Sequence, residues 1–248
     1  HLFKPFGMPE MRSHLIDSLN RRDRITERNT TSAEMSTEAR ARHTTAMEAV
    51  LEGTAALARA VEARDPFTAR HGARVGEYAM RVAQELDPDE SLIDRRGFLL
   101  GCQLHDIGKL GLPDVILNKA GTLEPHERES LERYPVIGRS LLSPLLDDEV
   151  ALAVVGWHKE CWDGSGYPDG LSGVAIPLAP RIVAMCDALD ATTSDHAHRS
   201  ALGWDQALEL IRDMSGSRYD PDVVAAMLAC VDDLHAIFSS SHREMESE

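Results

Sequence analysis

The residues best suited to chemistry in this sequence are a histidine followed directly by an aspartate, His105-Asp106, in an apolar segment predicted to be helical. Adjacent helical side chains point about 100° apart, so both can reach one metal ion when the helix end is buried. Imidazole and carboxylate together suit Fe, Mn or Zn better than Ca. Lys109 follows one turn later, aimed at the same face. A lone His-Asp pair is more often structural, so the surrounding residues must decide between the two interpretations.

A second conspicuous feature is a loop at residues 163–170, which reads Asp-Gly-Ser-Gly-Tyr-Pro-Asp-Gly. Three glycines and a proline within eight residues cannot continue a helix. The loop therefore separates two helical segments, and its polar residues follow His158, Lys159 and Glu160 in the chain.

The elements that must position these residues are predicted to be helices. Only 5% of the 248 residues are aromatic, and Ala, Leu, Glu and Arg recur throughout, which favours helices over a β-sandwich. We therefore expect an all-α fold. The predicted helices cover residues 68–86, 92–109, 125–142, 149–158, 180–191, 204–214 and 222–238.

Charge and cysteine content exclude several classes of protein. The net charge of −15 argues against a broad DNA-binding surface. No apolar run approaches the roughly 20 residues that cross a membrane, and the N-terminus lacks a signal-peptide pattern, so we expect a cytoplasmic protein with no membrane partner. The four cysteines form no C-x-x-C pair, which favours reduced thiols over a disulfide or zinc framework.

Two motifs carry a resemblance to a known family. Residues 103–113, Gln-Leu-His-Asp-Ile-Gly-Lys-Leu-Gly-Leu-Pro, look like the HD superfamily of metal-dependent phosphohydrolases. His158, Glu160, residues 162–171 and Ile176-Pro177 resemble the signature of the HD-GYP branch, whose known activity is hydrolysis of cyclic di-GMP. The resemblance implies a helical HD-domain bundle over residues 65–240, followed by a tail at 241–248.

The resemblance also implies a set of metal ligands. The first metal ion, with Fe or Mn expected, would be held by four residues: His71, His105, Asp106 and Asp187. A second ion would need Asp106 and His158 with two further histidines, but Tyr134 and Lys159 stand at those positions. A neutral phenol and a positively charged amine are poor partners for a cation, so we expect the second site to be lost or badly weakened.

Substrate contacts follow from the same resemblance. Lys109 would stabilise charge on the phosphate oxygens. Of two basic residues that contact phosphate in the family, one is replaced by His196 and the other is retained as Arg199. A neutral imidazole is a weaker anion partner than a guanidinium. Lys159 could compensate by neutralising a phosphate oxygen directly.

The loop has two interpretations. Gly164, Gly166, Tyr167 and Pro168 could form a rigid lid that braces the site, or a surface for a partner; within the family such loops are linked to diguanylate cyclase domains.

The N-terminal residues resemble part of a signalling protein. Lys4-Pro5-Phe6 followed by an amphipathic helix resembles the end of a response-regulator receiver domain, over residues 1–28. Residues 29–64 are predicted to form a long linker helix. An apolar seam of about two heptads, Met47, Val50, Thr54, Leu57 and Val61, fits a homodimeric coiled coil and an ordinary helix about equally. The position of this helix after a receiver-like segment tips the expectation slightly towards a homodimer.

Two hypotheses follow for function. The first is a cyclic di-GMP phosphodiesterase that serves as the output of a response regulator, with slow turnover because the second-metal ligands are missing. The second is a catalytically degenerate module that binds nucleotide or a signalling partner.

Overall fold

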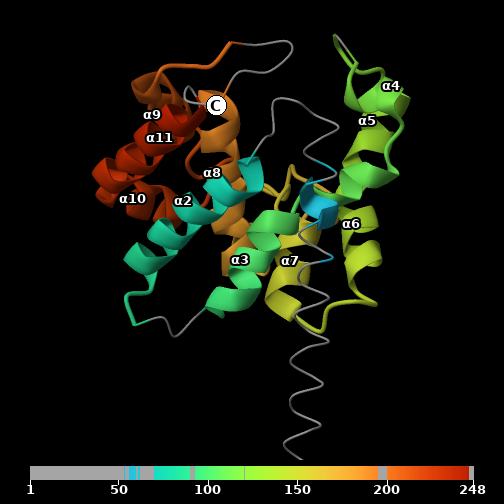
Figure 1. Ribbon diagram of the computed structural model, residues 1–248, viewed down its shortest axis with the longest axis horizontal. Coiled ribbons are helices and arrows are strands. Elements are labelled where there is room, and N and C mark those ends of the chain that lie inside the picture. Colours follow the sequence, from blue (N-terminus) through green and yellow to red (C-terminus); the bar gives the residue numbers. More distant parts are fainter. Residues whose placement is uncertain are drawn as a thin grey trace, which may run out of the picture. The chain divides into compact units, whose positions relative to one another are not determined.

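The computed structural model describes residues 53, 56–59, 61, 70–89, 93–119, 121–194 and 200–245. The described residues form helices and loops with no β-strand (Figure 1), which confirms the all-α prediction. The main helices are α2 (His71–Leu86), α3 (Arg95–Leu104), α4 (Asp114–Leu117), α5 (Pro125–Glu132), α6 (Tyr134–Leu142), α7 (Glu149–Trp157), α8 (Leu178–Thr193), α9 (Trp204–Asp213), α10 (Pro221–Ala229) and α11 (Val231–Met245), with short 3-10 helices η1 (Ile107–Gly111) and η2 (Gly173–Ala175).

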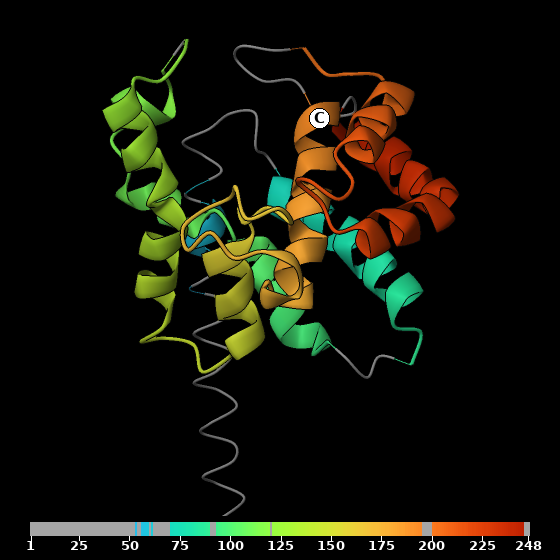
Figure 2. The same cartoon turned by 180° about the vertical axis from the view of Figure 1, so that it is seen from behind.

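Helix α8 is the centre of the described domain. It packs against α2, α7, α9 and α10, and in both views α4–α6 lie on one side of it and α9–α11 on the other (Figures 1 and 2). Its apolar side chains are buried on several faces; Ile182, Val183, Met185, Cys186 and Leu189 are fully buried. A helix that is apolar nearly all round belongs in a core. Two acidic residues on this helix are also buried, and they mark the polar site described below.

The predicted helix at 92–109 is wrong at its C-terminal end. Helix α3 begins after Asp94, whose carboxylate accepts a hydrogen bond from the Gly97 N–H at 2.7 Å. It ends at Leu104, and the chain tightens into η1, where the Lys109 N–H donates to the Asp106 carbonyl at 2.9 Å. The HD pair therefore lies at a junction between two helix types, and this junction directs the two side chains.

Two other predicted helices are each divided in two. Residues 125–142 break at Arg133 into α5 and α6, because Pro135 has no N–H to continue the hydrogen-bond ladder. Residues 222–238 break at Cys230 into α10 and α11, and α10 begins at Pro221 after the N-cap Asp220. The other four predicted helices, at 68–86, 149–158, 180–191 and 204–214, are confirmed. Their observed ends differ from the predicted ones by at most three residues.

Several predictions fall outside the described residues. These are the receiver-like segment at 1–28, nearly all of the linker helix at 29–64 with three of its five seam residues (Met47, Val50 and Thr54), and the end of the 241–248 tail. The domain boundaries stay predictions. Within the described part of the chain, no single helix has the length and apolarity of a membrane span, and only α10 and α11 taken together, bent by 71°, reach that criterion.

Gly108 lets the HD junction pack closely on α6. A Cβ atom at this position would lie 1.8 Å from the Tyr134 carbonyl oxygen and 2.7 Å from the Gly138 nitrogen. Both are backbone atoms, so no side-chain rotation can relieve the overlap. Glycine here fixes the distance between the HD pair and Tyr134.

Gly108→Ala is expected to lower the free energy of unfolding by about 1–3 kcal/mol, because η1 must move away from α6. Urea unfolding followed by circular dichroism measures this. Gly76→Ala is the matched control, since its added Cβ would meet neighbours at 3.6 Å, and it is expected to be neutral or slightly stabilising. Equal midpoints for Gly108→Ala and the unaltered chain would contradict the close packing.

Candidate metal centre and substrate pocket

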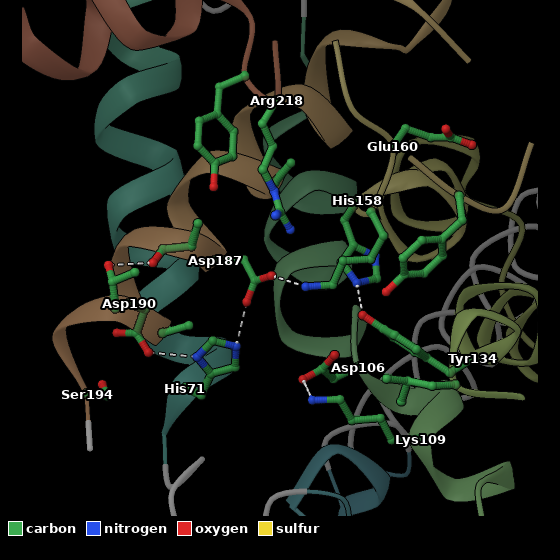
Figure 3. Close-up of a pocket in the computed structure, with 18 of the residues that line it drawn as sticks. His71, Asp106, Lys109, Tyr134, His158, Glu160, Asp187, Asp190, Ser194 and Arg218 are labelled. Carbon is green, nitrogen blue, oxygen red and sulfur yellow. Dashed lines mark hydrogen bonds and ion pairs between the residues drawn. The ribbon is translucent and has the colours of Figure 1, made fainter. Parts of the chain in front are cut away.

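A cavity of about 560 Å³ lies at the middle of the described domain. Its lining comes from α2, η1, α6, α8 and the segment after α9, together with the residues that follow α7 (Figure 3). Among its polar lining residues are His71, Asp106, Lys109, Tyr134, His158, Lys159, Asp187, Asp190 and Arg218. Groups that lie far apart in the sequence thus share one pocket.

The first predicted ligand set converges at the floor of this pocket. His71 Nε2 lies 3.3 Å from His105 Nε2 and 3.1 Å from Asp187 Oδ1. Asp187 Oδ1 lies 3.7 Å from His105 Nε2, and Asp106 Oδ2 is also 3.7 Å from that nitrogen. His71, His105 and Asp106 each offer a ligand atom within 4.8 Å of the others, and Asp187 joins this group through its contacts with the two histidines.

The other ring nitrogens of the two histidines are held by the protein. His71 Nδ1 donates to Asp190 Oδ2 at 2.7 Å, and His105 Nδ1 donates to the Cys102 carbonyl at 2.7 Å. Both rings are nearly completely buried. This leaves both Nε2 atoms as the ligand nitrogens, which is the usual arrangement for metal-bound histidine. The donor set fits one divalent metal ion.

Charge within the cluster favours ionised carboxylates. Burial lowers the pKa of His71, but hydrogen bonds and charge from Asp187 and Asp190 outweigh it and raise the pKa to about 10. Burial opposes ionisation of Asp106, yet Lys109 and then His105 hold the pKa of its carboxyl well below its usual value. A cation is therefore favoured at this point, and metal binding would displace a proton from His71.

Two supporting residues were missed by the sequence analysis. Arg74 donates to both oxygens of Asp190, from Nε at 2.7 Å and from a terminal nitrogen at 2.9 Å. Asp190 in turn orients His71. The signal was available in the spacing, because Asp190 follows Asp187 by three residues and Arg74 follows His71 by three, which places each pair on one helix face.

The residues at the expected second metal site make other interactions. The Tyr134 hydroxyl donates to His158 Nε2 at 2.7 Å, and His158 Nδ1 donates to the Val154 carbonyl at 3.0 Å. Lys159 Nζ lies 2.5 Å from Asp187 Oδ2. Burial, then the charges of His105 and Lys159, lower the pKa of His158 to about 3, so the ring is neutral. Burial likewise raises the pKa of Tyr134 well above its usual value. This set does not fit a second divalent ion.

The pocket also holds cations that could meet a phosphate. Lys109 Nζ pairs with Asp106 and lies 5.9 Å from the centre of the Tyr134 ring. Figure 3 shows Arg218 pointing into the same space; the sequence analysis missed this residue because it lies beyond α9, far from the motifs. His196 and Arg199, the predicted phosphate contacts, lie outside the described residues.

The glycine-rich loop is held against the pocket by its own chain. The buried Glu160 carboxylate accepts backbone N–H groups of Asp169 at 2.7 Å and Leu171 at 3.0 Å. The Trp157 indole donates to the Asp169 side chain at 2.8 Å. Tyr167 lines the pocket, and a Cβ at Gly166 would lie 2.3 Å from the Cys161 nitrogen. These contacts support the bracing interpretation for Tyr167, whereas Gly164 and Pro168 do not line the pocket.

Comparison with known proteins gives a consistent family. A family model described as "HD domain" matches residues 55–223. A cyclic di-GMP phosphodiesterase of Thermotoga maritima is 40% identical over 171 residues, covering 67% of this chain and 45% of the relative. The cyclic di-GMP phosphodiesterase response regulator RpfG of Xanthomonas campestris is 40% identical over 174 residues, covering 69% and 46%. The chain thus spans about half the length of these curated relatives.

Solved structures agree on the fold. A Vibrio cholerae structure described as a cyclic GMP-AMP specific phosphodiesterase matches with a TM-score of 0.55 at 20% identity, covering 74% of this chain and 49% of that one. Bd1817, described as an HDG"Y"P protein from Bdellovibrio bacteriovorus, matches with a TM-score of 0.52 at 20% identity, covering 65% and 51%. With its His-Asp cluster, its helical fold and these matches, the chain belongs to the HD-domain family, whose members bind divalent metal ions.

Proposed function

We propose that this domain is a metal-dependent phosphodiesterase of the HD-GYP branch that hydrolyses cyclic di-GMP. The observation that carries the proposal is the cluster of His71, His105, Asp106 and Asp187 at the floor of a pocket that also holds lysines. The pocket volume of about 560 Å³ lies in the range of small-molecule sites. Two relatives at 40% identity carry the name cyclic di-GMP phosphodiesterase.

The reaction is hydrolysis of a phosphodiester bond. The oxygen of water forms a bond to phosphorus, the bond from phosphorus to the ribose O3′ breaks, and one proton of the water ends on that leaving oxygen while the other is released to solvent. The product is linear pGpG, and cleavage of its remaining diester bond gives GMP. A divalent ion, with iron or manganese favoured by the mixed nitrogen and oxygen donors, lowers the pKa of water and polarises a phosphoryl oxygen when it is bound.

The chain's own residues position the reactants. The four ligands hold the cation. Asp190, itself held by Arg74, fixes the orientation of the His71 ring. Lys109 offers a positive charge beside Asp106, where it can stabilise the phosphate oxygens. We expect slow turnover, because Tyr134 and Lys159 stand where a second ion would otherwise bind.

The proposal is tested by supplying cyclic di-GMP to the purified chain after anaerobic loading with Fe(II) or Mn(II). We expect pGpG to accumulate, separated from GMP by chromatography. Turnover should disappear after treatment with a chelator and return when the metal ion is added again. A folded, metal-loaded chain that leaves cyclic di-GMP intact would contradict the proposal.

We also propose that the domain acts as the output of a response regulator, with residues 1–28 as the end of a receiver and residues 29–64 as a linker helix that pairs in a homodimer. The support is the sequence resemblance and the name of the Xanthomonas relative. Light scattering of the full chain measures the molar mass of the particle in solution, which we expect to be that of two chains. A monomer at micromolar concentration would contradict the homodimer.

A binding module is the second candidate function, with a diguanylate cyclase domain as the partner. It is favoured by the exposed residues Asp163, Asp169 and Gly170 of the loop, and by Val174 in the adjoining η2, which is 82% exposed. Val174→Asp should weaken capture of such a domain while cyclic di-GMP turnover is kept. Unchanged capture by this variant would argue against the loop as the partner surface.

A further inference from the structure

The carboxylate of Asp187 lies between the histidine cluster and a lysine. Its Oδ1 faces the histidine cluster, 3.1 Å from His71 Nε2, while its Oδ2 lies 2.5 Å from Lys159 Nζ. One oxygen is therefore directed to the metal-binding point and the other to an ammonium group (Figure 3). The Lys159 ammonium lies on the far side of Asp187 from the two histidines.

The groups near Lys159, namely His158, Tyr134 and Asp106, do not form a second cation site. His158 has one lone pair available, on Nε2, because Nδ1 donates to Val154, and the Tyr134 hydroxyl donates to that lone pair. His158 is 1% and Tyr134 2% exposed, so breaking this hydrogen bond would leave two largely desolvated polar groups at a cost in free energy. The carboxylate of Asp106 is met by the ammonium of Lys109. Each carboxylate on this side thus already has a lysine partner.

We propose that the Lys159 ammonium takes the place of a second metal ion, so that the centre works with one bound ion and one built-in positive charge. This inference rests on the proposed function, because it assigns Lys159 a contact with the scissile phosphate. Lys159 lines the same pocket as the ligand cluster, and its side chain is 23% exposed, so a phosphate can reach the ammonium group.

The chemical reason is the charge of the reacting group. In phosphoryl transfer the negative charge is spread over the non-bridging oxygens, and a positive group held beside them lowers the barrier. An ammonium is a compact point charge that can donate three hydrogen bonds. Lys159 acts here as a fixed charge and gives up no proton during the reaction.

Counting metal ions tests the first half of the proposal without measuring activity. The full chain is loaded anaerobically with Mn(II), freed of loosely bound ions, and analysed for manganese per chain. We expect one ion in the unaltered protein and two in Tyr134→His/Lys159→His, in which two imidazoles replace the phenol and the amine. Two ions in the unaltered protein, or one in the double variant, would overturn the replacement.

Charge variants test the second half. Lys159→Gln is expected to lower kcat/KM for cyclic di-GMP by about 10²-fold, with the manganese count unchanged at one. Lys159→Arg keeps the charge and is expected to stay within about tenfold of the unaltered protein. Equal kcat/KM for Lys159→Gln and the unaltered protein would show that Lys159 is only a structural partner of Asp187.

Inorganic phosphate separates failure of this inference from failure of the proposed function. Calorimetric titration with phosphate into the Mn(II)-loaded chain needs no turnover. Lys159→Gln should bind phosphate about tenfold more weakly than the unaltered protein, and Lys159→Arg should bind it about as well. If the unaltered protein leaves cyclic di-GMP intact, the proposed function is wrong, and the manganese count with phosphate affinity still decides the role of Lys159. Equal phosphate affinity in all three proteins would overturn that role.

Discussion

Replacing Asp106 with alanine is expected to lower the turnover of cyclic di-GMP by at least about 10³-fold, since a metal ion contributes several kcal/mol to stabilising the transition state. Asp106 Oδ2 lies 3.7 Å from His105 Nε2 and contacts the ammonium of Lys109. The substitution therefore removes one carboxylate ligand and leaves Lys109 without that partner beside the remaining ligands. Repulsion between the lysine and a bound cation adds to the loss of the ligand.

Two measurements separate this loss from unfolding. The manganese content per chain should fall from one to well below one, while the circular dichroism spectrum and the urea midpoint should change little, because the Asp106 side chain is part-exposed at 16%. Asp232→Ala removes an equally charged group from the exposed surface of α11 and should keep full turnover. An Asp106→Ala chain that keeps both manganese and turnover would refute the metal centre.

The sequence analysis located the centre because two local motifs mark it. His105-Asp106 is adjacent in the chain, and the family resemblance added His71 and Asp187 from single positions 34 and 82 residues away from His105. The structure brings these four together, although their role as metal ligands stays a prediction. The fold class followed from composition and periodicity, since the described helices are amphipathic or apolar in the expected way.

Long-range contacts could not be predicted from the sequence. The sequence assigned Lys159 a position where a cation should bind, but its partner Asp187 lies 28 residues away on α8. The hydrogen bond from Tyr134 to His158 joins α6 to the end of α7, and its existence depends on how these helices pack. Arg218 enters the pocket from beyond α9. Each of these contacts requires the relative placement of two helices, which periodicity does not specify.

The end of helix α3 at the site could not be predicted from the sequence either. The apolar pattern continues past Leu104 through Ile107, so it predicted one continuous helix to Lys109. The change to the tighter 3-10 form is explained by the tertiary contact of Gly108 with the Tyr134 carbonyl. The pattern of apolar residues was nearly the same for both helix types, and packing decided between them.

Arg74→Met is expected to lower the free energy of unfolding by about 3–5 kcal/mol, because it takes the guanidinium away from a buried carboxylate and leaves His71 as its remaining partner. The side chains of Arg74 and Asp190 are 6% and 2% exposed, and the guanidinium donates to both carboxylate oxygens. Urea unfolding gives the difference in free energy. Arg74→Lys keeps the charge without the two-pronged geometry and should have an intermediate effect.

An exposed arginine on the same helix provides the matched control. Arg81 pairs with Asp233 at 2.7 Å, but the two side chains are 25% and 62% exposed, so Arg81→Met should change the free energy of unfolding by no more than about 1 kcal/mol. Equal destabilisation by the two substitutions would contradict the argument from burial.

The same substitution has a second, independent consequence at the metal centre. Asp190 holds the Nδ1 atom of His71 at 2.7 Å, so a carboxylate freed from Arg74 no longer fixes the orientation of that ring. Loss of such an outer contact typically lowers metal affinity by about 10–100-fold. Manganese titration of Arg74→Lys, the variant expected to stay folded, should show this fall, whereas Arg81→Met should bind manganese as the unaltered protein does. Unchanged affinity in Arg74→Lys would mean that His71 is oriented by Asp187 and the helix backbone, without Arg74.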